Sequence, residues 1–359
     1  MRPKSRYHTT LFRPLAAIIT AALLSPACDY KPPVVGQADV LVIITSDEDR
    51  PLLEPLLMEI FGRTMATPSP EPFFKVLMAP PEKFERYRYY NSLIVASVAN
   101  PADSSGDLLT QRILGPEREM AALAGGNPIF VARDFLARGQ MFMGILALDA
   151  IQAQTELERL GSWVFDQFED QLRVRQKVVV FRKGENEDLS DSLAAEFGWQ
   201  MRLEKDYLRI KDRPEDAFVW LGRGYPYRWL SVHWVEQADS VRLSREWAWQ
   251  RMELIAGKLF AIMTIDSLFR TSELGIENEH EILILRGVWA HTQQVAGGPF
   301  VTYVFRDREQ HRIYMVTGLV FHPAGNKVLL IKRQEIMIRT FHTFDEPPVA
   351  KVASGRNLT

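Results

Sequence analysis

The chain has 359 residues, of which 47% are hydrophobic and 25% charged, so it has enough apolar material for a packed core. Its length favours two domains of ordinary size. The formal net charge is −2 at pH 7, and lysine and arginine are not concentrated in any run, which argues against a nucleic-acid partner.

The first 27 residues have the pattern of a bacterial lipoprotein signal peptide. An apolar run covers residues 15–24, and Ala27 precedes Cys28, the only cysteine. About ten apolar residues are half the length of a helix that crosses a bilayer. The alternatives are a soluble export signal and an uncleaved anchor, because Ser25 stands where a large aliphatic residue is usual. The basic residues ahead of the apolar run are Arg2, Lys4, Arg6 and Arg13.

We therefore expect cleavage before Cys28 and acylation at that residue, with diacylglycerol and a fatty acid such as palmitate anchoring the protein to a membrane. The mature chain is mildly acidic, with 39 basic against 45 acidic residues, because the signal peptide carries four basic and no acidic residues. With its thiol modified, the chain can form no disulfide or thiolate metal site. We expect residues 28–37 to form a tether and residues 345–359, which are poor in large apolar side chains, to form a disordered tail.

Strands and helices alternate over residues 38–185, which predicts a first domain of α/β type. Four acidic or hydroxyl residues, Ser46 to Asp49, follow the first strand, and helix capping explains them better than a cation site. No GxGxxG follows that strand, which excludes a dinucleotide fold. The expected strands are 40–45, 73–78, 93–98, 129–133 and 141–148, and the expected helices are 52–61, 81–90, 108–124 and 151–175.

Residues 186–344 have a different pattern, with short aromatic strands followed by longer alternating ones. This pattern predicts an antiparallel sheet backed by helices, so the whole chain is expected to be α+β. Asp307 to Gln310 form the expected turn of a hairpin. The expected strands are 199–210, 218–222, 229–235, 282–291, 300–306 and 313–322, and the expected helices are 244–260 and 328–340.

Several short motifs together resemble an uncharacterised Bacteroidota lipoprotein family that carries only a domain-of-unknown-function label. They are Pro70-Glu71-Pro72-Phe73-Phe74, Gly139-Gln140, Phe218 to Leu221, Arg286 to Trp289, Gly297 to Tyr303, Asp307, Gly318 to Pro323, Arg333-Gln334-Glu335 and Thr340. The resemblance implies a lipid-anchored protein of the cell envelope, in the outer membrane rather than the inner one. It implies no activity.

The glycines Gly297 and Gly298 favour a tight turn before the strand that Pro299 starts, rather than a ligand-binding loop. A dense aromatic stretch supplies the candidate recognition patch, with stacking rings beside a polar side chain. The patch residues are Tyr225, Tyr227, Trp229 and Arg228. For the tryptophans of this stretch we favour the simpler interpretation, that they fill the core between sheet and helix; they are Trp220, Trp229 and Trp234.

No catalytic or metal-binding motif is present. The sequence lacks HExxH, GxSxG and GxxxxGK[ST], and no histidines have zinc-like spacing, so we expect no metal and no cofactor. The favoured function is a membrane-tethered, non-catalytic binding or assembly module, with an envelope protein or glycan as partner. A hydrolase or transferase acting on an envelope glycan or cell-wall component is the alternative, with Glu281, His291 and Asp307 in unassigned roles. A carrier of a lipid or hydrophobic ligand is a third alternative.

Overall fold

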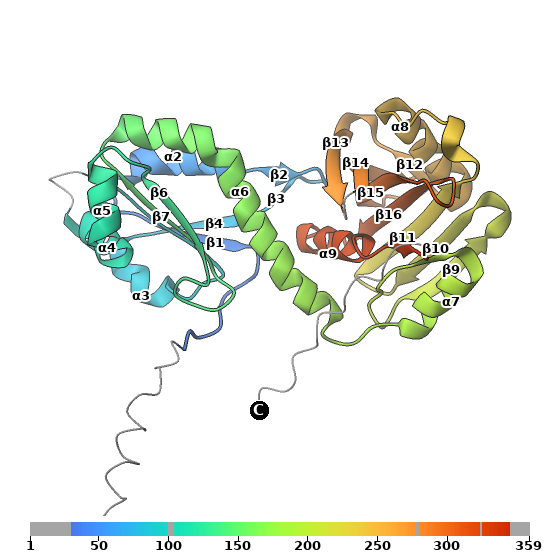
Figure 1. Ribbon diagram of the computed structural model, residues 1–359, viewed down its shortest axis with the longest axis horizontal. Helices are drawn as coiled ribbons and strands as arrows, with labels where there is room; N and C mark the ends of the chain where they lie inside the picture. The colour runs from blue at the N-terminus through green and yellow to red at the C-terminus, as the bar shows by residue number, and fades with distance from the viewer. Residues whose placement is uncertain (1–29, 100–103, 278–279, 324, 345–359) are drawn as a thin grey trace, which may run out of the picture.

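The computed structural model describes residues 30–99, 104–277, 280–323 and 325–344. The expected signal peptide, Cys28 and the expected tail at 345–359 lie outside these residues. Two separate sheets organise the described chain, and helices cover both of them, which makes the fold α+β as predicted (Figure 1).

The first sheet has five strands in the order β4-β1-β5-β7-β6. Four run parallel, and β6 pairs antiparallel with β7 at one edge. These strands are buried because helices cover both faces: α2 and α6 pack on one, and α3, α4 and α5 on the other. The bounds are β1 Val40–Ile44, β4 Lys75–Ala79, β5 Ser92–Val98, β6 Ile129–Arg133, β7 Met141–Ala147, α2 Arg50–Phe61, α3 Phe84–Tyr87, α4 Ser104–Leu114, α5 Pro116–Leu123 and α6 Ala150–Phe181.

Two details of this half differ from the predictions. The single helix expected over 108–124 is interrupted at Gly115, which has φ 81°, and α5 begins at the following proline. The acidic cluster caps the chain only in part: the Ser46 hydroxyl accepts the Asp49 amide at 3.1 Å just ahead of α2, but the Asp49 carboxylate caps no amide of the helix. Instead, the buried Asp49 carboxylate accepts a hydrogen bond from the Val98 amide at 3.0 Å, and so joins the start of α2 to the end of β5.

The second sheet is antiparallel and has eight strands in the order β12-β14-β15-β16-β11-β10-β9, with β13 also paired to β14. Helix α9 packs on one face, and α8 with the π-helix that continues it packs on the other. The bounds are β9 Leu208–Arg213, β10 Phe218–Arg223, β11 Tyr227–Val235, β12 Met263–Ile265, β13 Thr271–Glu277, β14 His280–His291, β15 Gly297–Asp307, β16 Arg312–Phe321, α7 Glu187–Phe197, α8 Arg245–Leu254, the π-helix Ile255–Phe260 and α9 Val328–Ile338.

The turn predicted at Gly297-Gly298 is wrong, because both glycines lie inside β15 and neither has a positive φ. Glycine is needed at both positions because a Cβ atom there would collide with a neighbouring strand. A Cβ on Gly298 would lie 1.9 Å from the Val320 carbonyl oxygen, and one on Gly297 would lie 2.6 Å from that of Trp289. The strand expected over 199–210 is also wrong: β8 covers only Trp199–Gln200, and the chain resumes as a strand at β9.

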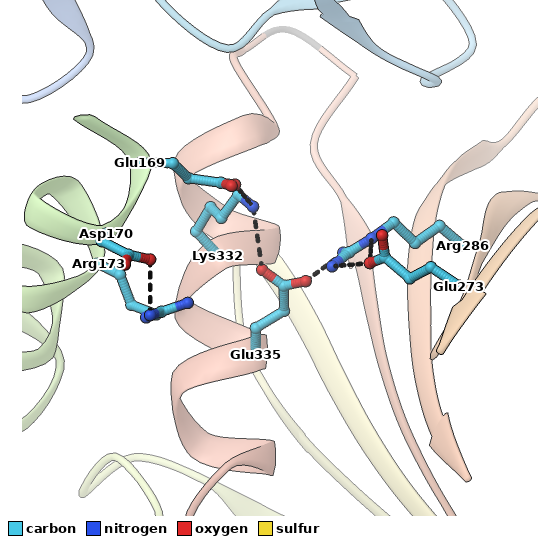
Figure 2. A network of polar contacts seen from close by, with 7 residues as sticks. All are labelled: Glu169, Asp170, Arg173, Glu273, Arg286, Lys332 and Glu335. Atoms are coloured by element: carbon cyan, nitrogen blue, oxygen red, sulfur yellow. Dashed lines mark hydrogen bonds and ion pairs between the residues drawn. The ribbon is translucent and has the colours of Figure 1, made fainter. Parts of the chain in front are cut away.

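Helix α9 lies between the second sheet and the long helix α6 (Figure 1). A chain of charges follows this junction from α6 through α9 to β14 and β13 (Figure 2). Lys332 bonds Glu169 and lies 3.3 Å from Glu335, which in turn bonds Arg286. Arg286 then pairs with Glu273 at 3.3 Å. The two halves of the chain are therefore joined by paired charges, of which Lys332 and Glu335 are buried.

A short hairpin of the N-terminal half crosses the same junction. Its strands are β2 (Thr64–Met65) and β3 (Glu71–Pro72), and Met65 belongs to the core of the second sheet. The Glu71 carboxylate receives hydrogen bonds from the amide and the ammonium group of Lys327, at 2.6 and 2.7 Å. Both halves thus contribute residues to a shared interface.

Residues 33–37, assigned to the tether on sequence, lie against the N-terminal half. Pro33 bridges to Arg138 and Val35 to Tyr90, while the Asn91 side chain donates to the carbonyls of residues 35, 36 and 37. Across the described part of the chain, no helix combines the length and the apolar character needed to span a bilayer.

Candidate binding surface

The hairpin of β10 and β11 carries the aromatic residues singled out in the sequence. Its turn places Tyr225 and Tyr227 at the surface, with 57% and 42% of each residue exposed. Trp229 is half-buried and points to the same face as Tyr227, because alternate residues of a strand share a face. Three of the four predicted patch residues therefore lie together on the molecule.

The rings of this face form a continuous stack across two strands. Tyr227 stacks on Trp229 with ring centroids 6.0 Å apart, and on Phe321 of the neighbouring β16 at 6.1 Å. Tyr225 meets Tyr227 edge-on at 5.9 Å and His322 at 5.2 Å. Such contacts fix the orientation of the rings and leave their edges available to a partner.

Two aliphatic residues of the edge strand β9 extend the surface. Leu208 and Ile210 are 67% and 47% exposed, although both are large and apolar. A Cβ on Gly222 would lie 2.4 Å from the Ile210 side chain and 2.5 Å from the Trp229 ring, so these two side chains meet above the glycine. We call the set Leu208, Ile210, Tyr225, Tyr227, Trp229, Phe321 and His322 the aromatic face.

Arg228 does not belong to the aromatic face, which corrects the predicted patch. It is 2% exposed and points to the opposite side of the sheet, where its guanidinium donates to both oxygens of the Glu204 carboxylate at 2.9 and 2.8 Å. Arg223 donates to the same carboxylate at 2.5 Å. This buried cluster holds β10 and β11 against the loop before β9, so Arg228 has a structural role.

The core interpretation accounts for two of the tryptophans. Trp220 packs edge-on against Phe260 of the π-helix at 4.8 Å, and Trp234 lies on the α9 side of the sheet, where it contacts Phe197 at 5.6 Å. Trp229 has both roles, because it touches Trp220 and buried Trp289 on one side and Tyr227 on the other. The aromatic stretch is thus part core and part surface.

The residues suggested for catalysis are not brought together. Glu281 and His291 lie at opposite ends of β14, about 33 Å apart along an extended strand of this length. The Asp307 carboxylate accepts hydrogen bonds from the amides of Glu309 and Gln310 at 2.9 Å and so closes the β15–β16 turn. The geometry gives these three groups no common reaction centre.

Histidines and metal ligands offer no further site within the residues that the structure describes. Those residues contain no group of three or more histidine, cysteine or carboxylate side chains placed to hold a metal ion. His233 is 4% exposed, and burial lowers its pKa to about 4, with the charge of Arg251 adding to the effect. Its Nδ1 lies 2.9 Å from the Ala217 carbonyl oxygen, so it is a neutral core side chain.

The residues that carry the family resemblance have structural roles in this fold. Glu335 and Arg286 belong to the junction of the two halves, and Gln334 donates to the buried Tyr207 hydroxyl at 2.7 Å. Thr340 accepts the Arg202 amide at 2.9 Å. Gln140 donates to the carbonyls of residues 88 and 90. Of the residues in the quoted motifs, only Phe321 and His322 reach the aromatic face.

Comparison with family models agrees with one part of that resemblance. Residues 186–340 match a domain of unknown function (DUF4837), a stretch that includes the whole aromatic face. No curated protein sequence matches the chain. The domain-of-unknown-function label is therefore confirmed for this stretch, and the match assigns no activity.

Three solved structures are similar to part of the chain. A point mutant of the protein Mog1 and the Saccharomyces cerevisiae Ran-binding protein Mog1p each share 10% identity and a TM-score of 0.29, over 41% of this chain and 90% of theirs. A structure from Bacteroides thetaiotaomicron shares 7% identity and a TM-score of 0.28, over 41% of this chain and 45% of that one. Likeness at these scores supports no conclusion about function.

Proposed function

We propose that the protein is a lipid-anchored envelope protein, attached through Cys28, that binds a partner and has no catalytic role. The observation that carries the binding role is the aromatic face, where Tyr225 and Tyr227 stand beside two exposed aliphatic side chains. Exposed tyrosine and tryptophan clusters supply much of the binding energy at protein interfaces.

The composition of the face favours a protein partner over a glycan. Glycan sites combine aromatic stacking with several polar side chains, whereas Leu208 and Ile210 offer only apolar contact. The charged side chains of the hairpin, Arg223 and Arg228, are paired with carboxylates on the other side of the sheet. We therefore propose another envelope protein as the partner.

A short attachment is consistent with this role. Because residues 32–37 are held against the N-terminal half, only the stretch from Cys28 to Pro32 is left to reach the membrane, at most roughly 14 Å when extended. The N-terminal half would then lie close to the bilayer, in the outer membrane by the family resemblance.

The anchor is tested by metabolic labelling with an alkyne analogue of palmitate in cells producing the wild type or Cys28→Ala, followed by membrane fractionation. We expect label and membrane association in the wild type and the loss of both in the variant. Unlabelled, soluble wild-type protein would contradict the anchor. Crosslinking in the same membranes then identifies neighbours, and recovery of a glycan instead of a protein would overturn the choice of partner.

A further inference from the structure

A groove lies at the end of the second sheet, separate from the aromatic face. It has a volume of about 800 Å³, within the range of sites that hold small molecules. Its lining comes from the start of α8, from the paired strands β13 and β14, and from the end of β15. The lining residues are Leu243, Ser244, Arg245, Leu274, Glu281, Ile282, Leu283, Arg306 and Arg308.

One wall of the groove is apolar and open. Leu274 pairs directly with Leu283, so the two side chains share the face of the sheet that α8 covers further along. Leu283 is buried, but Leu274 is 74% exposed, and Ile276, two residues on and on the same face, is 77% exposed. An alkyl chain laid along this strip would cover apolar surface that now contacts water.

The other wall carries three guanidinium groups, those of Arg245, Arg306 and Arg308. The lining contains a single carboxylate, that of Glu281. The Arg306 side chain is held in place, because its two terminal nitrogens donate to the carbonyl oxygens of Ala238 and Val241. These acceptors are neutral, so they do not compensate the positive charge of the guanidinium group. Within the described part of the chain, neither Arg245 nor Arg308 forms an ion pair with a carboxylate, although Arg245 interacts electrostatically with the adjacent Glu246, and both arginines are exposed.

Helix α8 starts at the same wall. Its cap, Ser244, accepts the Trp247 amide at 3.2 Å, and the helix then runs for ten residues away from the groove. The positive end of its dipole therefore adds to the charge of the arginines. Positive charge thus meets exposed apolar surface within one groove.

We infer that this groove binds a single-chain amphiphile with an anionic head, a carboxylate or a phosphate, whose alkyl chain follows Leu274 and Ile276 and whose head is held by Arg245 and Arg308. Guanidinium groups bind both kinds of head through paired, charge-assisted hydrogen bonds. This inference does not depend on the partner proposed for the aromatic face.

The test uses the full chain with Cys28→Ala, so that no acyl group of its own competes, and calorimetric titration with probes of equal chain length below their micelle concentrations. The probes are dodecanoate, dodecyl phosphate, neutral dodecanol and inorganic phosphate. We expect saturable binding of one or both anionic amphiphiles, and much weaker binding of dodecanol and of inorganic phosphate. Binding by only one anionic probe would identify the head group.

Exposed residues allow variants that leave the fold intact. Arg245→Ala and Arg308→Ala should each weaken binding roughly tenfold, while Arg133→Ala, an exposed arginine of the other half, should not. Leu274→Ser should weaken binding, and Leu268→Ser, at an 85% exposed leucine outside the groove lining, should have no effect. No saturable binding of either anionic amphiphile, equal binding of dodecanol, or equal effects of the groove and control variants would overturn the inference.

Discussion

Glu335 offers the sharpest test of how the two halves are joined. Its carboxylate is buried in α9 between Lys332 and Arg286 (Figure 2). Burial alone would raise its pKa, but the two cations outweigh burial and lower the pKa from 4.5 to about 2. A pKa difference of that size between the unfolded and the folded chain corresponds to about 3 kcal/mol of folding free energy at neutral pH.

The sign of the pH dependence follows from the direction of this shift. Because the folded pKa lies below the unfolded value, ionised Glu335 stabilises the fold above about pH 4.5, and that stabilisation is lost as the pH falls toward 2. Glu335→Gln, which resembles the protonated form, should therefore cost about 3 kcal/mol at pH 7 and about half of that at pH 3.

Urea unfolding followed by tryptophan fluorescence at pH 7 and pH 3 measures both values. The matched control is Glu273→Gln, because Glu273 pairs with the same Arg286 but its side chain is 59% exposed, and it should cost less than about 1 kcal/mol. If Glu335→Gln costs no more than this control, or costs the same at both pH values, the buried network does not stabilise the junction as described.

Three further variants or titrations test the second sheet. Gly298→Ala should cost several kcal/mol of folding free energy or prevent folding, because its Cβ would meet the Val320 carbonyl. Gly257→Ala is the control and should be near neutral, because the space around Gly257 is open. Thermal unfolding compares the two variants. The His233 imidazole should titrate by NMR near pH 4, and since this pKa lies below 6.5, folding stability should fall as the pH drops from 6.5 to 4. Arg228→Ala should cost about 1.5 to 3 kcal/mol in urea unfolding, because the buried Glu204 carboxylate loses two hydrogen bonds and keeps only Arg223 as a partner; a cost below about 0.5 kcal/mol would contradict its structural role.

Much of the fold could be predicted because local patterns and tertiary packing agree. The apolar run at β1 is buried on both faces, and the helical spacing after it forms α2. Helix α7 was not predicted, although its signals are present: Asn186 caps it by accepting the Leu189 amide, and Gly198 ends it with φ 78°.

The errors have specific physical causes. The sequence suggests a turn at Gly298, but the reason for glycine there is the approach of Val320 from a neighbouring strand, which no local pattern reveals. Arg228 could have been excluded from the patch, because it alternates with Tyr227 and Trp229 along one strand. The contribution of Ile210 to the aromatic face depends on the pairing of β9 with β10, which the sequence alone does not specify.

The binding role of the aromatic face is the central claim, and site-specific photocrosslinking in intact cells tests it most directly. A benzophenone amino acid replaces Tyr227 in one strain and Leu268, an exposed residue outside the face, in another. We predict that position 227 captures one defined envelope protein, that position 268 does not, and that Leu208→Ser together with Tyr225→Ala reduces the yield. No adduct at position 227, or the same adducts from both positions, would contradict the account.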